Sequence, residues 1–129
     1  MQQATASNPF DSARIIVPAL AISAIGALFY NLLPLFVGSA QDFRALGNRE
    51  AGFISSAFFL GYNAVTIWAF FWIRRWSWRL VTWCALPIAM LGMLAAARSD
   101  SYAVLLLATM VSGGGFAALY GIGTTVLAD

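Results

Sequence analysis

Arginine and tryptophan gather in one short stretch, and their side chains carry the most evident binding chemistry of the chain. Residues 70–79 read FFWIRRWSWR, in a chain without lysine. Guanidinium groups attract anionic lipid headgroups, and indole rings favour the headgroup level of a membrane. Nucleic-acid binding would need a larger basic surface than a net charge of +2 provides, and a surface-lying helix would need separated polar and apolar faces. We therefore expect an interfacial loop and no nucleic-acid partner.

Catalytic and metal-binding side chains are scarce. The chain contains no histidine and one cysteine, Cys84, which lies in an apolar run. This composition excludes disulfides, Cys/His zinc sites and histidine acid–base catalysis within the sequence, and it favours a packed apolar role for Cys84. We expect no enzymatic activity, no metal and no cofactor.

The elements that carry these side chains are four long apolar runs. The composition is 61% hydrophobic and 9% charged, whereas soluble domains carry roughly a quarter charged residues. The runs cover residues 15–37, 51–73, 80–97 and 102–128. A run of about 20 residues crosses a bilayer as a helix, so we predict an all-α integral membrane protein with four spans. The third run is short, and we expect Pro87 to kink it.

The segments outside the runs are short and more polar. Residues 1–14 are predicted to form a cytoplasmic N-terminal lead, and residues 38–50 a water-exposed connection. Arginines near short loops stay on the cytoplasmic side, and the loop after residue 73 concentrates three of them without an acid. The opposite loops pair Arg44, Arg49 and Arg98 with acids. We therefore predict a multi-pass protein of the cell membrane with its N-terminus in the cytoplasm.

Polar residues inside the runs are uncharged, and two asparagines are the most costly to expose to lipid. Asn31 lies in the first run and Asn63 in the second. Each could contact a substrate in a polar cavity, or donate an interhelical hydrogen bond worth about 0.6 kcal/mol. Both interpretations remain open from the sequence.

Small residues in the fourth run indicate close helix packing. Gly113, Ala117 and Gly121 recur every four residues and form a stripe on one helical face. Such a stripe lets a neighbouring helix approach closely within a membrane. A phosphate-binding loop would need a lysine and a preceding strand, neither of which the sequence suggests.

Two stretches together resemble the N-terminal part of a transporter of the major facilitator superfamily. They read NREAGFISSAFFLGYNAV (48–65) and GGGFAALYGIGTTVLAD (113–129), with a short arginine loop between them. The resemblance covers residues 15–129 and implies helices one to four of a twelve-helix transporter. In that fold two halves rock around a binding site near the membrane midplane.

The resemblance also implies roles for particular residues. Helices one and four line the cavity in this fold, which makes Tyr30, Asn31, Tyr120 and Thr124 candidates for cavity lining, together with Asn63 on the second span.

The family's cytoplasmic gate loop is matched in part. Gly61 fits the upstream helix glycine, Arg75 the paired arginine and Arg79 the terminal basic residue, whereas Arg74 stands where the family places an aspartate. The charge lock of relatives would therefore lack its acid here.

From this resemblance we expect alternating-access transport of a small solute. The expected partners are the lipid bilayer, the solute and the missing C-terminal helices of the same protein. One alternative is a non-transporting four-helix scaffold whose small-residue stripe binds a partner helix. Another is a small oligomeric multidrug exporter, but those proteins depend on a membrane-buried glutamate, and the predicted spans contain none.

Overall fold

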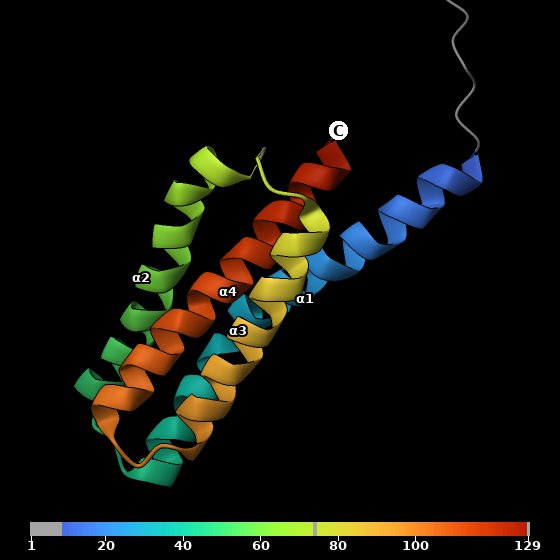
Figure 1. The fold of residues 1–129 in the computed structure, drawn as a ribbon. Helices are drawn as coiled ribbons and strands as arrows, with labels where there is room; N and C mark the ends of the chain where they lie inside the picture. Colours follow the sequence, from blue (N-terminus) through green and yellow to red (C-terminus); the bar gives the residue numbers. More distant parts are fainter. Residues whose placement is uncertain (1–8, 74, 129) are drawn as a thin grey trace, which may run out of the picture.

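A computed structural model of the protein describes residues 9–73 and 75–128, which fold into four helices (Figure 1). In chain order they are α1 (Pro9–Arg44), α2 (Asn48–Trp72), α3 (Trp78–Arg98) and α4 (Tyr102–Ala128). Each is long and apolar enough to cross a membrane. The structure thus shows an all-helical chain with the character of a membrane protein, and the four predicted spans correspond to its four helices.

Helix α1 is longer than the apolar run that predicted it. It begins at Pro9 and ends at Arg44, so residues 9–14 of the predicted lead and 38–44 of the predicted connection are helical. Its 36 residues extend about 54 Å at 1.5 Å per residue, well beyond a hydrocarbon core of about 30 Å. Hydropathy marks where a helix leaves hydrocarbon, whereas the backbone continues as a helix until a residue stops it.

Short, capped loops separate the helices. Ala45 has a φ of 49°, a left-handed conformation that ends α1. Glu50 accepts a hydrogen bond from the Gly47 amide at 2.9 Å, which fixes the start of α2. Ser77 accepts one from the Leu80 amide at 3.4 Å at the start of α3, and α3 continues as one helix through Pro87.

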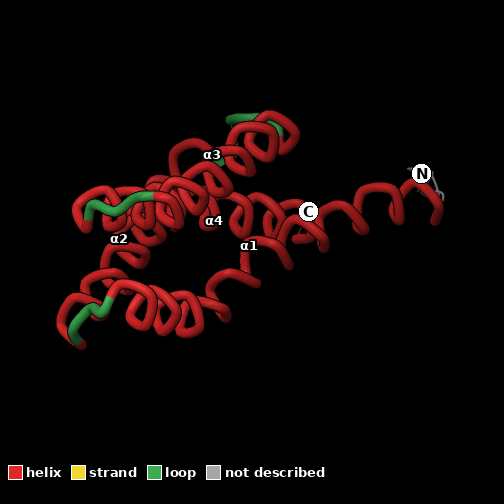
Figure 2. The backbone as a smooth tube through the Cα atoms, turned by 90° about the horizontal axis from the view of Figure 1, so that it is seen from below, coloured by secondary structure: helices red, strands yellow, loops and turns green. Residues whose placement is uncertain are grey.

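These loops make consecutive helices antiparallel. Residues 73 and 75–77 and the last turn of α4 lie at one end of the bundle, which we call the arginine end (Figure 1). Residues 45–47 and 99–101 lie at the other end, which we call the opposite end. The first turns of α1 project away from the other helices (Figure 2).

Helix α4 is the centre of the bundle. It packs against α1, α2 and α3, whereas α1 meets α2 over a short stretch and α3 has at most marginal contact with α1 and α2. In its apolar window 56% of residues are buried, compared with 11% in α1 and in α2. A helix that is hydrophobic on all sides suits this surrounded position.

Glycines bring all three neighbours close to α4. Gly61 of α2 lies against the Met110 carbonyl, and a Cβ on Gly115 would sit 2.8 Å from the Ala89 nitrogen of α3. On the α1 side, a Cβ on Gly26 would sit 2.6 Å from the Tyr120 nitrogen. Each approach brings backbone against backbone, which only a residue without a side chain permits.

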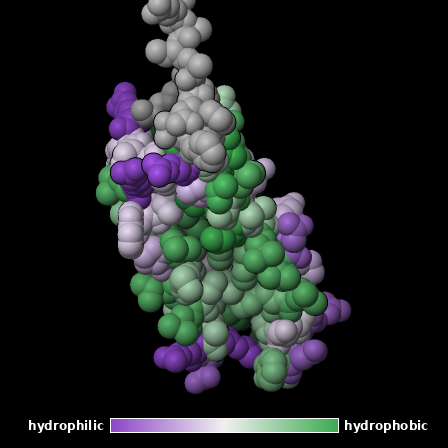
Figure 3. Space-filling view, turned by 90° about the vertical axis from the view of Figure 1, so that its right-hand side faces the viewer, coloured by the Kyte–Doolittle hydropathy of each residue, from purple (hydrophilic) through white to green (hydrophobic). Residues whose placement is uncertain are grey.

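Aromatic rings fill the space between α1, α2 and α4. Phe29 stacks on Phe116 with ring centroids 4.8 Å apart and an interplanar angle of 2°. Phe58 is fully buried, and its ring centroid lies 5.3 Å from that of Phe29. Hydrophobic residues cover most of the middle of the face shown in Figure 3, and hydrophilic clusters lie near its upper and lower ends.

Candidate functional site

A cleft of about 510 Å³ lies between α1 and α2 on the side toward the opposite end. It exists because both helices pack on α4 and meet each other only briefly. Its lining comes from α1 as Tyr30, Leu33, Pro34, Val37, Gly38 and Gln41, and from α2 as Ser55 and Phe59. The α1 residues recur at spacings of three and four, so they form one helical face.

The polar side chains of the cleft are uncharged. Gln41 lies near the loop at residues 45–47, and its Nε2 donates to Asn48 Oδ1 at 2.7 Å. Tyr30 lies about 16 Å deeper along α1 than Gln41, at a rise of 1.5 Å per residue. Ser55 lines the α2 side between them. The cleft therefore leads from a polar mouth toward the interior of the membrane span.

Tyr62 of α2 meets Tyr30 at the inner end of this cleft, and Tyr120 of α4 packs against α1 at Gly26, one turn from Tyr30. The rings of Tyr30 and Tyr62 have centroids 6.3 Å apart. Phe59 meets the Tyr30 ring edge-on at 5.6 Å. We call Tyr30, Tyr62 and Tyr120 the tyrosine cluster. It joins α1, α2 and α4.

The three tyrosines lie at similar depth, as the helical rise shows. On α1, Tyr30 lies about 21 Å from the end of the helix at the opposite end of the bundle. On α2, Tyr62 lies about 21 Å from that end, and on α4, Tyr120 lies about 27 Å from it. Gly26 allows this convergence, because the backbone and Cβ of Tyr120 occupy the space where a side chain on Gly26 would lie.

The cluster is open on one side. Tyr30 is 48% exposed and Tyr120 is 41% exposed, whereas Phe58 and Phe116 behind them are buried. A phenol hydroxyl needs a hydrogen-bond partner when it lies away from water. The tyrosine cluster can thus offer hydroxyl groups to a polar molecule or to water inside an otherwise apolar bundle.

The other cavity candidates lie apart from the cleft. Asn31 is exposed on α1, and its amide donates to the Ala27 carbonyl of its own helix at 2.9 Å. Asn63 is exposed on α2 and does not line the cleft. The Thr124 hydroxyl donates to the Tyr120 carbonyl at 2.9 Å. Of the five candidates, the structure therefore places Tyr30 on the cleft, and Tyr120 packs against α1 at Gly26, one turn from Tyr30.

The residues of the expected gate loop are spread over half the bundle. Arg75 and Arg79 are exposed at the arginine end, and the Arg79 guanidinium lies 5.4 Å from the ring centre of Trp78. Gly61 lies at the crossing of α2 with α4, about 16 Å from the last residue of α2. Arg74 lies outside the described residues.

The three residues of the small-residue stripe on α4 do not share one environment. Gly113 lies directly against the Phe58 carbonyl of α2, and Ala117 is buried. Among the described residues, a Cβ on Gly121 would meet only the end of the Ile73 side chain, at 3.5 Å. Two glycines outside this stripe, Gly115 and Gly123, instead lie close to α3 and α1.

Sequence reasoning left Tyr62, Gln41 and Ser55 out of the site. The face from Tyr30 to Gln41 was recognisable from its helical spacing, but ending the first span at residue 37 placed Gln41 in a loop. Tyr62 is a polar residue of the second span without a distinguishing pattern. Its role follows from the rotation of α2 on α4, which no spacing in the sequence reveals.

The site has the chemistry of recognition by hydrogen bonds and apolar contact. Within residues 9–73 and 75–128, no group of three metal-ligating side chains comes together. Comparison of the chain with models of known protein families, with curated proteins and with solved structures finds no match.

Proposed function

We propose that these four helices are the N-terminal part of a transporter of the major facilitator type, which moves a small solute by alternating access. The observation that supports this proposal is the tyrosine cluster at the inner end of the cleft between α1 and α2. Tyr30 and Tyr62 meet there from α1 and α2, and Tyr120 of α4 packs against α1 at Gly26, one turn from Tyr30. A solute site between helices uses a few placed polar groups on an apolar wall.

In this proposal the solute enters along the cleft and meets Tyr30 at its inner end. Gln41 and Ser55 offer an amide and a hydroxyl on the way in, so a neutral solute with several hydrogen-bonding groups suits the path. Further helices of the same protein would cover the exposed edges of Tyr30 and Tyr120. The arginine end would face the cytoplasm of a cell membrane, where arginines of short loops concentrate.

The alternative of a non-transporting scaffold has less support than transport. It required a small-residue stripe on α4 that a partner helix could reach, but Gly113 and Ala117 are covered within the bundle. The exporter alternative required a buried glutamate, and Glu50 is exposed near the opposite end. Neither has an observation that favours it over transport.

The decisive experiment is solute uptake by the natural gene product that contains this sequence, reconstituted in liposomes and screened against neutral and charged metabolites. Tyr30→Phe removes one hydroxyl from the cleft, and a lost hydrogen bond of about 1 kcal/mol corresponds to roughly fivefold weaker apparent affinity. Asn31→Leu is the matched control, because it changes the adjacent residue outside the cleft.

Absence of uptake for every solute would refute transport. Uptake that responds to Asn31→Leu but not to Tyr30→Phe would refute the assignment of the cleft.

A further inference from the structure

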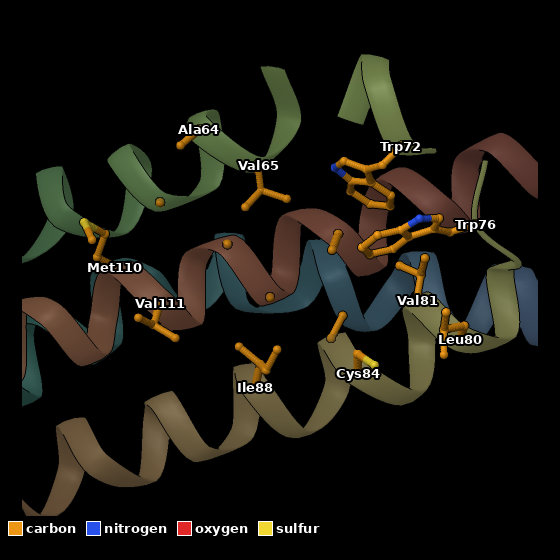
Figure 4. A pocket seen from close by; sticks show the side chains of 15 residues that line it. Ala64, Val65, Trp72, Trp76, Leu80, Val81, Cys84, Ile88, Met110 and Val111 are labelled. Atoms are coloured by element: carbon orange, nitrogen blue, oxygen red, sulfur yellow. The ribbon is translucent and has the colours of Figure 1, made fainter. Parts of the chain in front are cut away.

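A second hollow, larger and apolar, lies on the other side of α4. It is a groove of about 600 Å³ between α2 and α3, with α4 as its floor (Figure 4). It forms because α2 and α3 both pack on α4 and have at most marginal contact with each other. The floor is lined by the small residues Gly114, Gly115 and Ala118, which leave room above it. We call it the α2–α3 groove.

The groove has the length of one membrane leaflet. On α2 it extends from Gly61 to Trp72, about 16 Å, and on α3 from Leu80 to Ile88, about 12 Å. Half of a hydrocarbon core is about 15 Å. Gly61 and Ile88 lie near the middles of their helices, so the groove runs from the arginine end to the membrane midplane.

The end of the groove at the membrane surface is aromatic and basic. Trp72 and Trp76 lie side by side at this end, with ring centroids 6.2 Å apart (Figure 4). Arg75 precedes Trp76, and Arg79 precedes Leu80 of the groove wall; both arginines are exposed. Residues 70–79 contain no acid, so this part of the chain has a positive charge.

The length of the groove, its apolar lining and its positively charged end suit a phospholipid better than a further membrane-spanning helix. A spanning helix needs a groove through both leaflets, whereas this one covers a single leaflet. The lining contains almost only hydrocarbon side chains, which suit an acyl chain, and Arg75 and Arg79 are adjacent in sequence to the lining residues Trp76 and Leu80 at the end of the groove that would face the phosphate. Indole rings at the boundary between the two regions suit the headgroup level.

We propose that the α2–α3 groove binds an anionic phospholipid, with one acyl chain in the groove and the phosphate at Arg75 and Arg79. The lipid fills the space between α2 and α3 and thereby couples these helices in the leaflet at the arginine end. This site is separate from the cleft between α1 and α2, and it does not depend on the proposed transport activity.

Native mass spectrometry of the purified protein can test the headgroup contribution, with phosphatidylglycerol as the probe and phosphatidylcholine as the uncharged comparison. We expect one retained phosphatidylglycerol. Arg75→Gln with Arg79→Gln should lower its affinity about 30-fold, at about 1 kcal/mol per arginine. Arg49→Gln with Arg98→Gln removes two arginines of the opposite end and should leave the affinity unchanged.

Cys84→Trp tests the acyl-chain contribution, because Cys84 is exposed on the groove wall. It should lower phosphatidylglycerol binding, whereas Leu91→Trp, on an exposed part of α3 outside the groove, should not. For the unaltered protein, phosphatidylglycerol with a photoreactive acyl chain should label α2 and α3 at the residues of the groove.

The proposal is overturned if both lipids bind equally, if the two arginine pairs behave alike, or if labelling spreads evenly over all four helices. A dimer that shields Cys84 from lipid would equally overturn it.

Discussion

The guanidinium of Arg44 donates a hydrogen bond from Nη2 to the carbonyl oxygen of Ala96 at 2.8 Å, which joins the last turn of α1 to the last turn of α3. A second, longer bond of 3.4 Å reaches the carbonyl of Ala97. The last carbonyls of a helix have no partner within it, and the negative end of its dipole attracts a cation. Arg44 thus caps a helix that is distant from it in the sequence.

Arg44→Ala should lower the free energy of unfolding by about 1.5–3 kcal/mol, because a charged hydrogen bond to a partly buried carbonyl is lost. Detergent-induced unfolding followed by circular dichroism measures this change. Arg49→Ala is the control, since Arg49 is exposed and its guanidinium makes a cation–π contact with Phe53, 5.7 Å from the ring centre. Equal losses in the two variants would contradict the capping role.

Gly61→Ala should destabilise the bundle by about 1–3 kcal/mol, because its new Cβ would overlap the Met110 carbonyl and push α2 from α4. Gly52→Ala on the same helix has no atom of residues 9–73 and 75–128 within 4 Å of its new Cβ and should stabilise α2 by up to about 1 kcal/mol. Thermal unfolding of the two variants compares them directly. We expect the two substitutions to change the stability in opposite directions. Equal changes in stability at the two positions would contradict the role of the close contact between Gly61 and Met110.

Ser112→Ala should lower the free energy of unfolding by about 0.6 kcal/mol, the average value of interhelical hydrogen bonds in membranes. The buried Ser112 hydroxyl donates to the Ala89 carbonyl of α3 at 3.0 Å. Ser56→Ala is the comparison, because the exposed Ser56 hydroxyl bonds only to the Gly52 carbonyl of its own helix at 2.9 Å. The same detergent titration applies, and a larger effect at Ser56 would argue against the α3–α4 contact.

A cysteine introduced by Ser55→Cys should react with a hydrophilic thiol reagent, because the cleft admits water to the α2 wall. The experiment is simple in a Cys84→Ser background, since the chain has no other cysteine. Leu60→Cys on the exposed apolar surface of α2 should react far more slowly, because a thiol in lipid does not ionise. Comparable rates at both positions would mean that the cleft is closed to water.

The apolar runs identify the four helices but not all their boundaries. Hydropathy places the end of the first span at residue 37, whereas the helix continues to Arg44. The last of these extra residues, Arg44, is held by a carbonyl of α3. That contact joins distant parts of the sequence, so no local sequence pattern predicts it.

The candidate site was predictable as a set of residue types but not as an arrangement. Tyr30 and Tyr120 stand out as polar residues within apolar runs, whereas Tyr62 meets Tyr30 because of how α2 is rotated on α4. Asn31 is next to Tyr30 in sequence but points about 100° away on the helix. Rotation and crossing of helices arise from packing at positions such as Gly26 and Gly61, and sequence spacing fixes neither.

The central position of α4 sets an order for assembly during synthesis. The ribosome delivers α1, α2 and α3 first, yet most of the contacts that hold them together are contacts with the helix that arrives after them. Until α4 enters the membrane, Gly61 of α2 and Gly26 of α1 have no partner backbone to approach. The first three helices share few contacts with one another, so the packing of these four helices is complete only once the fourth is inserted.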